Sequence, residues 1–276
     1  MGSLRSARVY GLAVLTLLGG AAALRPVVAQ DAPPPTLDQI LERLETNLLH
    51  YDTVVPSFFC DEHVDSRLRS MKGTTGTIVD SVFRLKRVTG SDGKILLTES
   101  REMKMLDGRP AKADDIVGPG ILRGAFSGGL ALVSLSQKAC MHYTLKPIPE
   151  DGQGPYVVEF ESVPKKQRSA GCLLQEDGSG RVLIDSDSMQ IERIQLTAPH
   201  HVIGSVNLND GRLEGVWTVS VDYVPVVLGD ETLWMPSTIS GRITGENVPS
   251  VWSFDATYRN FHKLEVTSRI VPSGAP

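Results

Sequence analysis

The chain has 276 residues, with 28 basic and 32 acidic side chains and a formal net charge of −4. A domain that binds nucleic acid is usually basic, with Lys and Arg gathered on one face. The basic residues here are scattered along the chain, so we exclude nucleic acid as a partner. The length is sufficient for one large domain with a buried core.

The first 29 residues have the three-part layout of a cleavable secretory signal peptide. Arg5 and Arg8 form a basic start, an apolar run extends from Val9 to Leu24, and short side chains follow at Val27-Val28-Ala29. The alternative is an uncleaved membrane anchor. Because the run has 16 residues and a spanning helix needs about 20, we expect residues 1–29 to be removed.

Removal of the signal peptide makes the remaining chain more acidic. It takes away three Arg and leaves 25 basic against 32 acidic side chains, a net charge of −7 over 247 residues. The first cysteine, Cys60, lies too far along the chain for lipidation at the N-terminus. No later run approaches spanning length, so we expect no transmembrane segment after cleavage and an extracytoplasmic protein, either periplasmic or secreted.

A helix is expected directly after the export signal. Residues 30–35 form a Pro-rich linker, and Thr36 and Gln39 then have the spacing of a capping box. Apolar residues at 37, 40, 41, 44 and 48 recur at helical spacing. We therefore predict an amphipathic helix over 37–50, at the start of a single domain that covers 36–276.

Strands follow the helix. From Ser57 onward apolar and polar residues alternate, Val79 to Leu85 place every second residue on one face, and a turn at Gly90–Gly93 leads to a strand over Ile95–Met105. A polar loop is expected at 199–213. Further strands are expected at 141–148, 155–163, 171–175, 180–185, 189–198, 214–227, 232–245, 250–260 and 263–270. Long strands joined by short turns indicate antiparallel neighbours.

Residues 118–137 interrupt the strand pattern. Apolar residues there, including Phe126 and Leu132, follow a helical stripe, but Gly124, Gly128 and Gly129 each weaken a helix by about 1 kcal/mol. The segment is either a buried, Gly-containing helix or a short helix followed by an apolar loop.

The three cysteines, Cys60, Cys140 and Cys172, allow three pairings with one thiol left over. Export favours a disulfide. We favour Cys140–Cys172, because both residues lie at the starts of strand-like segments with another strand between them. The alternative is that all three are small buried thiols.

Cys60-Asp61-Glu62-His63 is the densest group of metal-ligand types in the sequence. On a strand, Cys60 and Glu62 face one way and Asp61 and His63 the other. At most two of them converge, whereas zinc needs three or four protein ligands. We therefore expect no metal, and interpret the segment as an edge strand with one buried cysteine and solvated charges.

Other motifs each lack an essential part. Gly118–Gly124 nearly matches G-x-G-x-x-G but has Arg123 in place of the third glycine, so we expect no cofactor. Asp185 and Asp187 begin like a calcium loop, but Gln190 replaces its obligatory glycine. No G-x-S-x-G elbow occurs, and the sequence selects no pair of carboxylates, so we expect no catalytic residues and no enzyme activity.

Several short segments together resemble a group of uncharacterised secreted bacterial proteins and, more distantly, the lipoprotein-carrier half-barrel family. They are Ser57–Cys60, Gly180–Asp185 with Ile191–Ile194, Val221–Tyr223, Leu233–Ser237 and Tyr258–Phe261. The resemblance covers most of the mature chain as an order of elements and carries over no catalytic residue. It implies a curved antiparallel sheet that wraps one or two helices and shelters acyl chains. The 199–213 loop is a departure from the smaller carriers.

The expected fold class is therefore mainly β with helices (α+β): a large curved antiparallel sheet, or half-open barrel, covering one or two helices. A concave apolar face must be covered, and incomplete cover leaves an apolar cavity. The expected lining residues are Phe83, Leu85, Phe126, Leu132, Val182, Ile184, Ile194, Trp217 and Val221. Trp217, Trp234 and Trp252, with Tyr223 and Tyr258, either line such a cavity or pack as ordinary strand residues, and we favour ordinary packing.

These features favour an exported, non-enzymatic binding protein that shelters a lipid or another apolar ligand. The first alternative is a structural or protein-interaction module of the cell envelope, with an envelope protein as its partner and a filled core. The second is a hydrolase of envelope polymers, which would need a polar cleft with convergent carboxylates or histidines. The ligand, the partner and the oligomeric state are not specified by the sequence.

Overall fold

The computed structural model describes residues 34–90, 93–112, 115, 124–126, 129–147, 154–202, 213–245 and 250–264. Residues Pro35–Pro276 form one compact unit. The predicted signal peptide lies outside the described residues, as do residues 30–33 of the expected linker.

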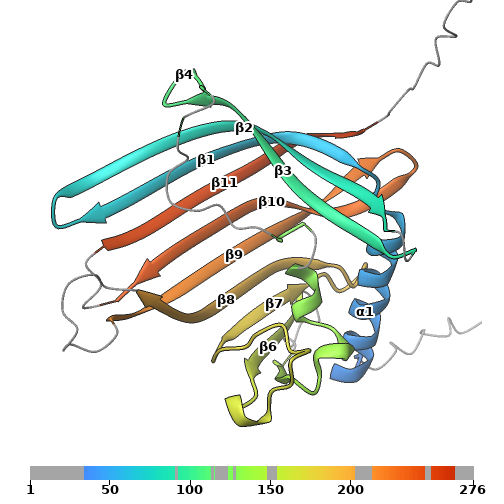
Figure 1. Ribbon diagram of the computed structural model, residues 1–276. Helices are drawn as coiled ribbons and strands as arrows, with labels where there is room; N and C mark the ends of the chain where they lie inside the picture. Colours follow the sequence, from blue (N-terminus) through green and yellow to red (C-terminus); the bar gives the residue numbers. More distant parts are fainter. Residues whose placement is uncertain are drawn as a thin grey trace, which may run out of the picture. The chain divides into compact units, whose positions relative to one another are not determined.

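Eleven strands of the described chain form one antiparallel sheet, in the order β4-β3-β2-β1-β11-β10-β9-β8-β7-β6-β5. The strands at the two ends of this order, β4 and β5, do not pair, so the sheet is open, and Figure 1 shows it curving beside a single long helix. The expected mainly β half-barrel is therefore confirmed. The strands are β1 (Phe58–Ser70), β2 (Gly73–Thr89), β3 (Ile95–Leu106), β4 (Arg109–Pro110), β5 (Met141–Leu145), β6 (Tyr156–Ser162), β7 (Ser179–Ile184), β8 (Ile191–Val202), β9 (Leu213–Leu228), β10 (Glu231–Thr244) and β11 (Ser250–Lys263).

The long helix α1 (Leu37–Val54) begins as expected. Thr36 accepts a hydrogen bond from the backbone of Gln39, whose side chain bonds back to the Thr36 backbone, which completes the capping box. The helix ends four residues later than expected. Tyr51 continues the apolar stripe of Ile40, Leu41 and Leu44 by a further turn and is buried with them.

Strand burial alternates because successive side chains point to opposite faces of a sheet. In β1, Phe58, Cys60, Glu62 and Val64 are buried, and the residues between them are half-buried or exposed. The buried sets of the strands belong to one hydrophobic cluster together with the apolar stripe of α1. We call this side of the sheet the inner face and the opposite side the outer face.

The expected helix at 118–137 is wrong for the part that the structure describes; residues 118–123, 127 and 128 lie outside that part. Two short 3₁₀ turns occur there, η1 (Gly129–Leu132) and η2 (Leu135–Gln137), and Gly124 has a φ of 84°, outside the range of a right-handed helix. A carbonyl group that a regular helix would have bonded internally is bound by a side chain instead: the Tyr143 hydroxyl donates to the Leu132 carbonyl oxygen. Of the two structures expected for 118–137, the short helix followed by an apolar loop is closer to the observed structure than the buried helix.

Two strand expectations also need correction. Residues 171–175 form no strand, because their polar groups pair locally: the Arg168 guanidinium donates to the Val163 and Gln175 carbonyl oxygens. The short 3₁₀ turn η3 (Lys165–Gln167) precedes this loop. The polar loop expected from residue 199 begins later, because β8 continues to Val202 in register with β9, and 203–212 lie outside the described residues.

The gap expected between the strands 250–260 and 263–270 is absent, because β11 continues without interruption to Lys263. Asn260, with a φ of 55°, lies opposite the register shift between Phe59 and Asp61. A bulge of this kind admits one extra residue without ending the strand. Residues 265–270 of the last expected strand lie outside the described residues.

A disulfide joins Cys140 and Cys172, whose Cα atoms are 5.4 Å apart, and Cys60 is a buried free thiol. This is the pair that the sequence analysis favoured. The bond ties the residues just before β5 to the 169–178 loop. Lys138, two residues from Cys140, forms an ion pair with Asp38 of α1 at 2.6 Å.

Gly180 of β7 tests how tightly the inner face packs. A Cβ atom at this position would overlap the Gln195 carbonyl oxygen and the Phe160 ring. Gly180→Ala should therefore lower the free energy of unfolding by about 2 kcal/mol or more, measured by urea denaturation.

Gly76→Ala is the matched control in another strand, because its Cβ would lie 3.8 Å from the Ser66 oxygen in ordinary contact. It should change the free energy of unfolding by no more than about 0.5 kcal/mol. Equal effects of the two substitutions would contradict the close packing around Gly180.

Candidate ligand-binding face

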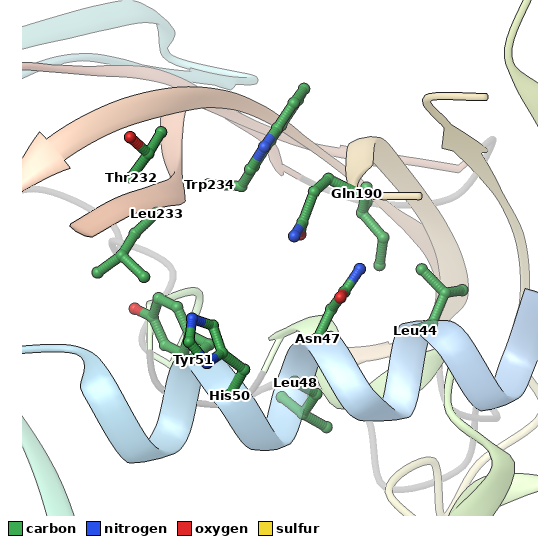
Figure 2. Close-up of a pocket in the computed structure, with 10 residues that line it drawn as sticks. Leu44, Asn47, Leu48, His50, Tyr51, Gln190, Thr232, Leu233 and Trp234 are labelled. Carbon is green, nitrogen blue, oxygen red and sulfur yellow. The ribbon is translucent and has the colours of Figure 1, made fainter. Parts of the chain in front are cut away.

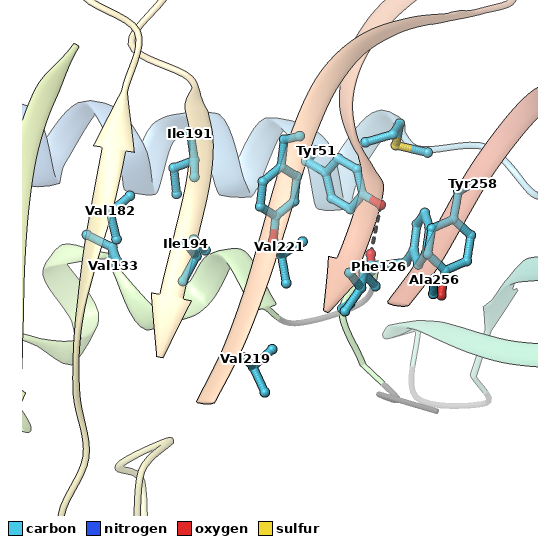
Figure 3. Close-up of a cluster of buried hydrophobic side chains, with 14 of the residues drawn as sticks. Tyr51, Phe126, Val133, Val182, Ile191, Ile194, Val219, Val221, Ala256 and Tyr258 are labelled. Carbon is cyan, nitrogen blue, oxygen red and sulfur yellow. Dashed lines mark hydrogen bonds between the residues drawn. The ribbon is translucent and has the colours of Figure 1, made fainter. Parts of the chain in front are cut away.

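All nine residues expected to line a cavity lie in the one hydrophobic cluster of the inner face. Seven are buried, and Leu132 and Trp217 are partly buried. The strand register brings them side by side: Val182 of β7 pairs with Ile194 of β8, which pairs with Val221 of β9. Figure 3 shows these three side chains on the same side of the sheet as Tyr51 and Phe126.

Aromatic rings concentrate in two places on this face. Around Phe126, the ring of Phe83 stacks at 4.4 Å, and the rings of Tyr258 and Phe58 lie at 4.9 and 5.9 Å. Phe58, Phe83 and Tyr258 come from β1, β2 and β11, which are adjacent strands. We call Phe58, Phe83, Phe126 and Tyr258 the aromatic nest.

The second concentration lies further along the same face. Trp217 and Trp252 stack at 4.9 Å with an interplanar angle of 11°, and Phe254 lies 5.1 Å from Trp252. The Trp252 indole N–H is buried and has no hydrogen-bond partner among the described residues. Trp234, the third tryptophan, lies elsewhere, beside α1.

A group of buried charges borders the aromatic nest. Arg101 of β3 donates through Nε to Glu62 of β1 at 2.8 Å, and its guanidinium lies 3.8 Å from the Glu99 carboxylate. The same guanidinium lies 4.9 Å above the Phe83 ring. All three charged side chains are largely or fully buried, so each ion offsets the desolvation of its neighbour.

This group corrects the interpretation of Cys60-Asp61-Glu62-His63. The strand is not an edge strand, because β1 lies between β2 and β11. Cys60 is buried and Asp61 and His63 are exposed, as expected, but Glu62 is 1% exposed and paired with Arg101. In the described ranges, no group of three or more Asp, Glu, His or Cys side chains is placed to hold a metal ion.

Glu99 also holds the segment Gly124-Ala125-Phe126. Its two carboxylate oxygens accept hydrogen bonds from the Gly124 and Phe126 backbone N–H groups, at 3.0 and 3.2 Å. The Tyr51 hydroxyl donates to the Phe126 carbonyl oxygen at 2.7 Å, the dashed line in Figure 3. Side chains of β3 and α1 therefore hold this backbone, and the described segment belongs to no strand.

Burial keeps the tyrosines of this face in their neutral, donating form. It raises the pKa of Tyr51 and of Tyr223 far above the usual range. Tyr51 uses its hydroxyl to bind Phe126. The Tyr223 hydroxyl is fully buried and has no partner in the described part of the chain, a position that a buried water molecule commonly satisfies.

A small pocket lies between the C-terminal half of α1 and the sheet (Figure 2). Leu44, Leu48 and Trp234 give it apolar walls, and the side chains of Asn47 and Gln190 add amide groups. Its free volume is about 30 Å³, enough for about two water molecules. Asn47 donates to the Met189 carbonyl oxygen at 2.7 Å, which fixes the neighbouring turn to the helix.

The outer face has a wider groove with charged side chains in its lining, of about 700 Å³. His63 and Asp80 form a hydrogen-bonded pair at 2.6 Å, and Asn260 donates to Asp61 at 2.7 Å. Lys104 adds a positive charge to the lining. Both signs of charge are interspersed, so the groove is not a simple anion or cation site.

The outer-face groove gathers Asp61, His63 and Asp80, but these groups are already bonded: His63 pairs with Asp80, and Asp61 accepts from Asn260. Glu62 and Glu99 converge on Arg101, but both are buried and their oxygens bind the guanidinium and two backbone N–H groups. Carboxylates engaged in this way anchor the structure. No described helix combines the length and apolar character needed to cross a membrane.

Models of known protein families give no match to this chain, and no curated protein matches it. Several solved structures are similar to it, among them the following two, both at low identity. One is a DUF1329 family protein from Desulfovibrio piger, 12% identical with a TM-score of 0.35, covering 82% of this chain and 93% of the other. The second is a putative outer membrane lipoprotein-sorting protein domain from Vibrio parahaemolyticus, 8% identical with a TM-score of 0.33, covering 79% of this chain and 89% of the other.

Sequence reasoning missed Glu99, Arg101 and Tyr51 as residues of this face. A partial signal exists, because Leu97, Glu99, Arg101 and Met103 alternate along β3 and so share one side of the strand. The pattern does not reveal that this side is the buried one, since both sides of β3 carry charges. The partner of Glu99 is a backbone segment 25 residues away, which no local pattern specifies.

The Glu62–Arg101 pair gives a stability prediction. Glu62→Gln leaves the largely buried Arg101 without its nearest counter-charge, so we expect a loss of about 3 kcal/mol in the free energy of unfolding, measured by urea denaturation. His63→Gln, one residue along on the exposed side, breaks a surface pair and should cost at most about 1 kcal/mol. Similar losses for both would contradict the burial of Glu62.

The thiol of Cys60 gives a second prediction. Burial, and then the nearby Glu62 charge, raise its pKa well above the usual range, so little reactive thiolate forms. Iodoacetamide should modify no cysteine of the folded protein, one in denaturant, and three in denaturant after reduction, counted by mass spectrometry. Rapid modification of the folded protein would contradict this placement.

Proposed function

We propose that this chain is an exported, non-enzymatic binding protein that shelters an apolar ligand on the inner face of its half-barrel. The observation that carries the proposal is the continuity of that face. Apolar side chains extend from Leu85 on β2 across the sheet to Ile184 on β7, within one cluster. These side chains are packed beneath α1 and the segments between β4 and β5, so a ligand would reach the face by displacing part of that cover, and the same apolar side chains would then keep it from water.

The cover of this face supports the proposal. The described cover consists of α1, two 3₁₀ turns and the segment 124–126, and the last is attached through side-chain hydrogen bonds. Such attachments are separable without breaking a sheet. Of the nine expected lining residues, the seven on strands, from Phe83 to Val221, are the surface that the ligand would contact, whereas Phe126 and Leu132 belong to the cover.

Export is part of the same proposal. The signal peptide at 1–29 would direct the chain out of the cytoplasm, to the periplasm or the medium, as one domain over 36–276. The Cys140–Cys172 disulfide fits an oxidising compartment. A released domain with an apolar inner face can carry or hold a lipid in an aqueous compartment.

The test is to express the chain with its signal peptide, purify it from the periplasm without detergent, and compare native and denatured masses. We expect an adduct that organic extraction removes, and displacement of that adduct by 1-N-phenylnaphthylamine. Trp217→Ala, on the inner face, should reduce dye affinity several-fold, and Val227→Ala, which is 69% exposed, should leave it unchanged. A folded protein without an adduct and without dye binding would overturn the proposal.

A protein-interaction module of the envelope is the second candidate. The observation that favours it is the charged outer-face groove between β1, β2 and β11. It predicts a partner in envelope crosslinking that is lost on Asp80→Lys, together with an inner face that binds no dye.

A further inference from the structure

The aromatic nest already holds an occupant from the chain itself. Phe126 is 2% exposed and contacts Phe83, Tyr258 and Phe58 with ring separations of 4.4 to 5.9 Å. Those three rings belong to adjacent strands of the sheet, whereas Phe126 belongs to none. The strands therefore supply a ring-lined slot, and Phe126 fills it.

The polar groups at the rim of this slot bind a peptide backbone. One carboxylate, that of Glu99, accepts the N–H groups of residues 124 and 126, and the Tyr51 hydroxyl donates to the carbonyl of residue 126. A hydrocarbon chain offers no N–H donor to Glu99 and no acceptor to Tyr51. A ligand that displaced Phe126 without replacing these three hydrogen bonds to Glu99 and Tyr51 would bind less tightly by the cost of their loss.

From these contacts we propose that the inner face takes a peptide segment with a large apolar side chain, which replaces Gly124-Ala125-Phe126 in the nest. The incoming segment places an aromatic or branched side chain among Phe58, Phe83 and Tyr258. Its backbone N–H groups bind Glu99, and a carbonyl accepts from Tyr51. This inference rests on the proposed function and names the ligand class for the same site.

Buried charge supports the role of Glu99 as a receptor for N–H groups. Arg101 lies 3.8 Å from the Glu99 carboxylate and is also paired with Glu62, so the Glu99 side chain is held in one position. A carboxylate held in position accepts two backbone N–H groups without losing further side-chain entropy. The chain's own Gly-Ala-Phe sequence is therefore the simplest probe of the slot.

The test uses the mature chain carrying Phe126→Ala and three probes: acetyl-Gly-Ala-Phe-amide, acetyl-Gly-Ala-Ala-amide and decanoate. Titration calorimetry should show the Phe peptide binding at least tenfold more tightly than the Ala peptide. Adding Glu99→Gln or Tyr51→Phe should weaken the Phe peptide several-fold and leave decanoate unchanged. If Phe126→Ala does not fold, the same titrations use Phe126→Leu. The leucine keeps an apolar side chain in the nest, which the peptide must then displace.

Tyr223→Phe is the matched control for Tyr51→Phe, because the Tyr223 hydroxyl has no partner among the described residues; peptide affinity should not change. Binding of decanoate without binding of the Phe peptide would overturn the ligand class and leave the proposed function standing. Peptide binding that Glu99→Gln and Tyr51→Phe leave unchanged would also overturn the ligand class. A folded variant that binds none of the probes would overturn both proposals.

Discussion

An open sheet with one apolar face must cover that face, and most of this structure follows from that requirement. Closing the sheet into a barrel would bury the inner face without further elements, but β4 and β5 do not pair. The described cover is therefore supplied by α1 and by short irregular segments between β4 and β5. Apolar burial drives these elements onto the sheet, and polar groups determine where they lie.

The polar groups that position the cover are few and specific. Glu99 and Tyr51 fix the segment at Phe126, Asn47 fixes the turn at Met189 to α1, and Lys138 pairs with Asp38. Each contact joins parts of the chain that are far apart in sequence. An apolar face alone would allow many positions for the cover, and these contacts select one.

The buried charges at the rim of the nest have a cost as well as a use. Glu62, Arg101 and Glu99 lose their hydration when the sheet forms. The attraction of Arg101 to the two carboxylates offsets that desolvation cost only in one geometry. The same arrangement gives Glu99 a fixed direction toward the backbone of residues 124 and 126. In the proposed site, stability and recognition thus depend on one group of side chains.

The sequence by itself determined the capped helix at Thr36, the alternating strands, and the mainly β fold, because capping and two-residue periodicity are local properties of the chain. It also selected seven strand residues of the inner face, since strand alternation assigns them to one side. It misjudged 118–137 and 171–175, where glycines and side-chain hydrogen bonds outweigh apolar spacing, and it placed Glu62 in solvent. Only the tertiary structure decided that β1 lies between two other strands and not at the edge of the sheet. It also decided that Arg101 contacts Glu62 across β2 and that Phe126 fills the aromatic nest. These depend on pairings between distant segments, which no local pattern encodes.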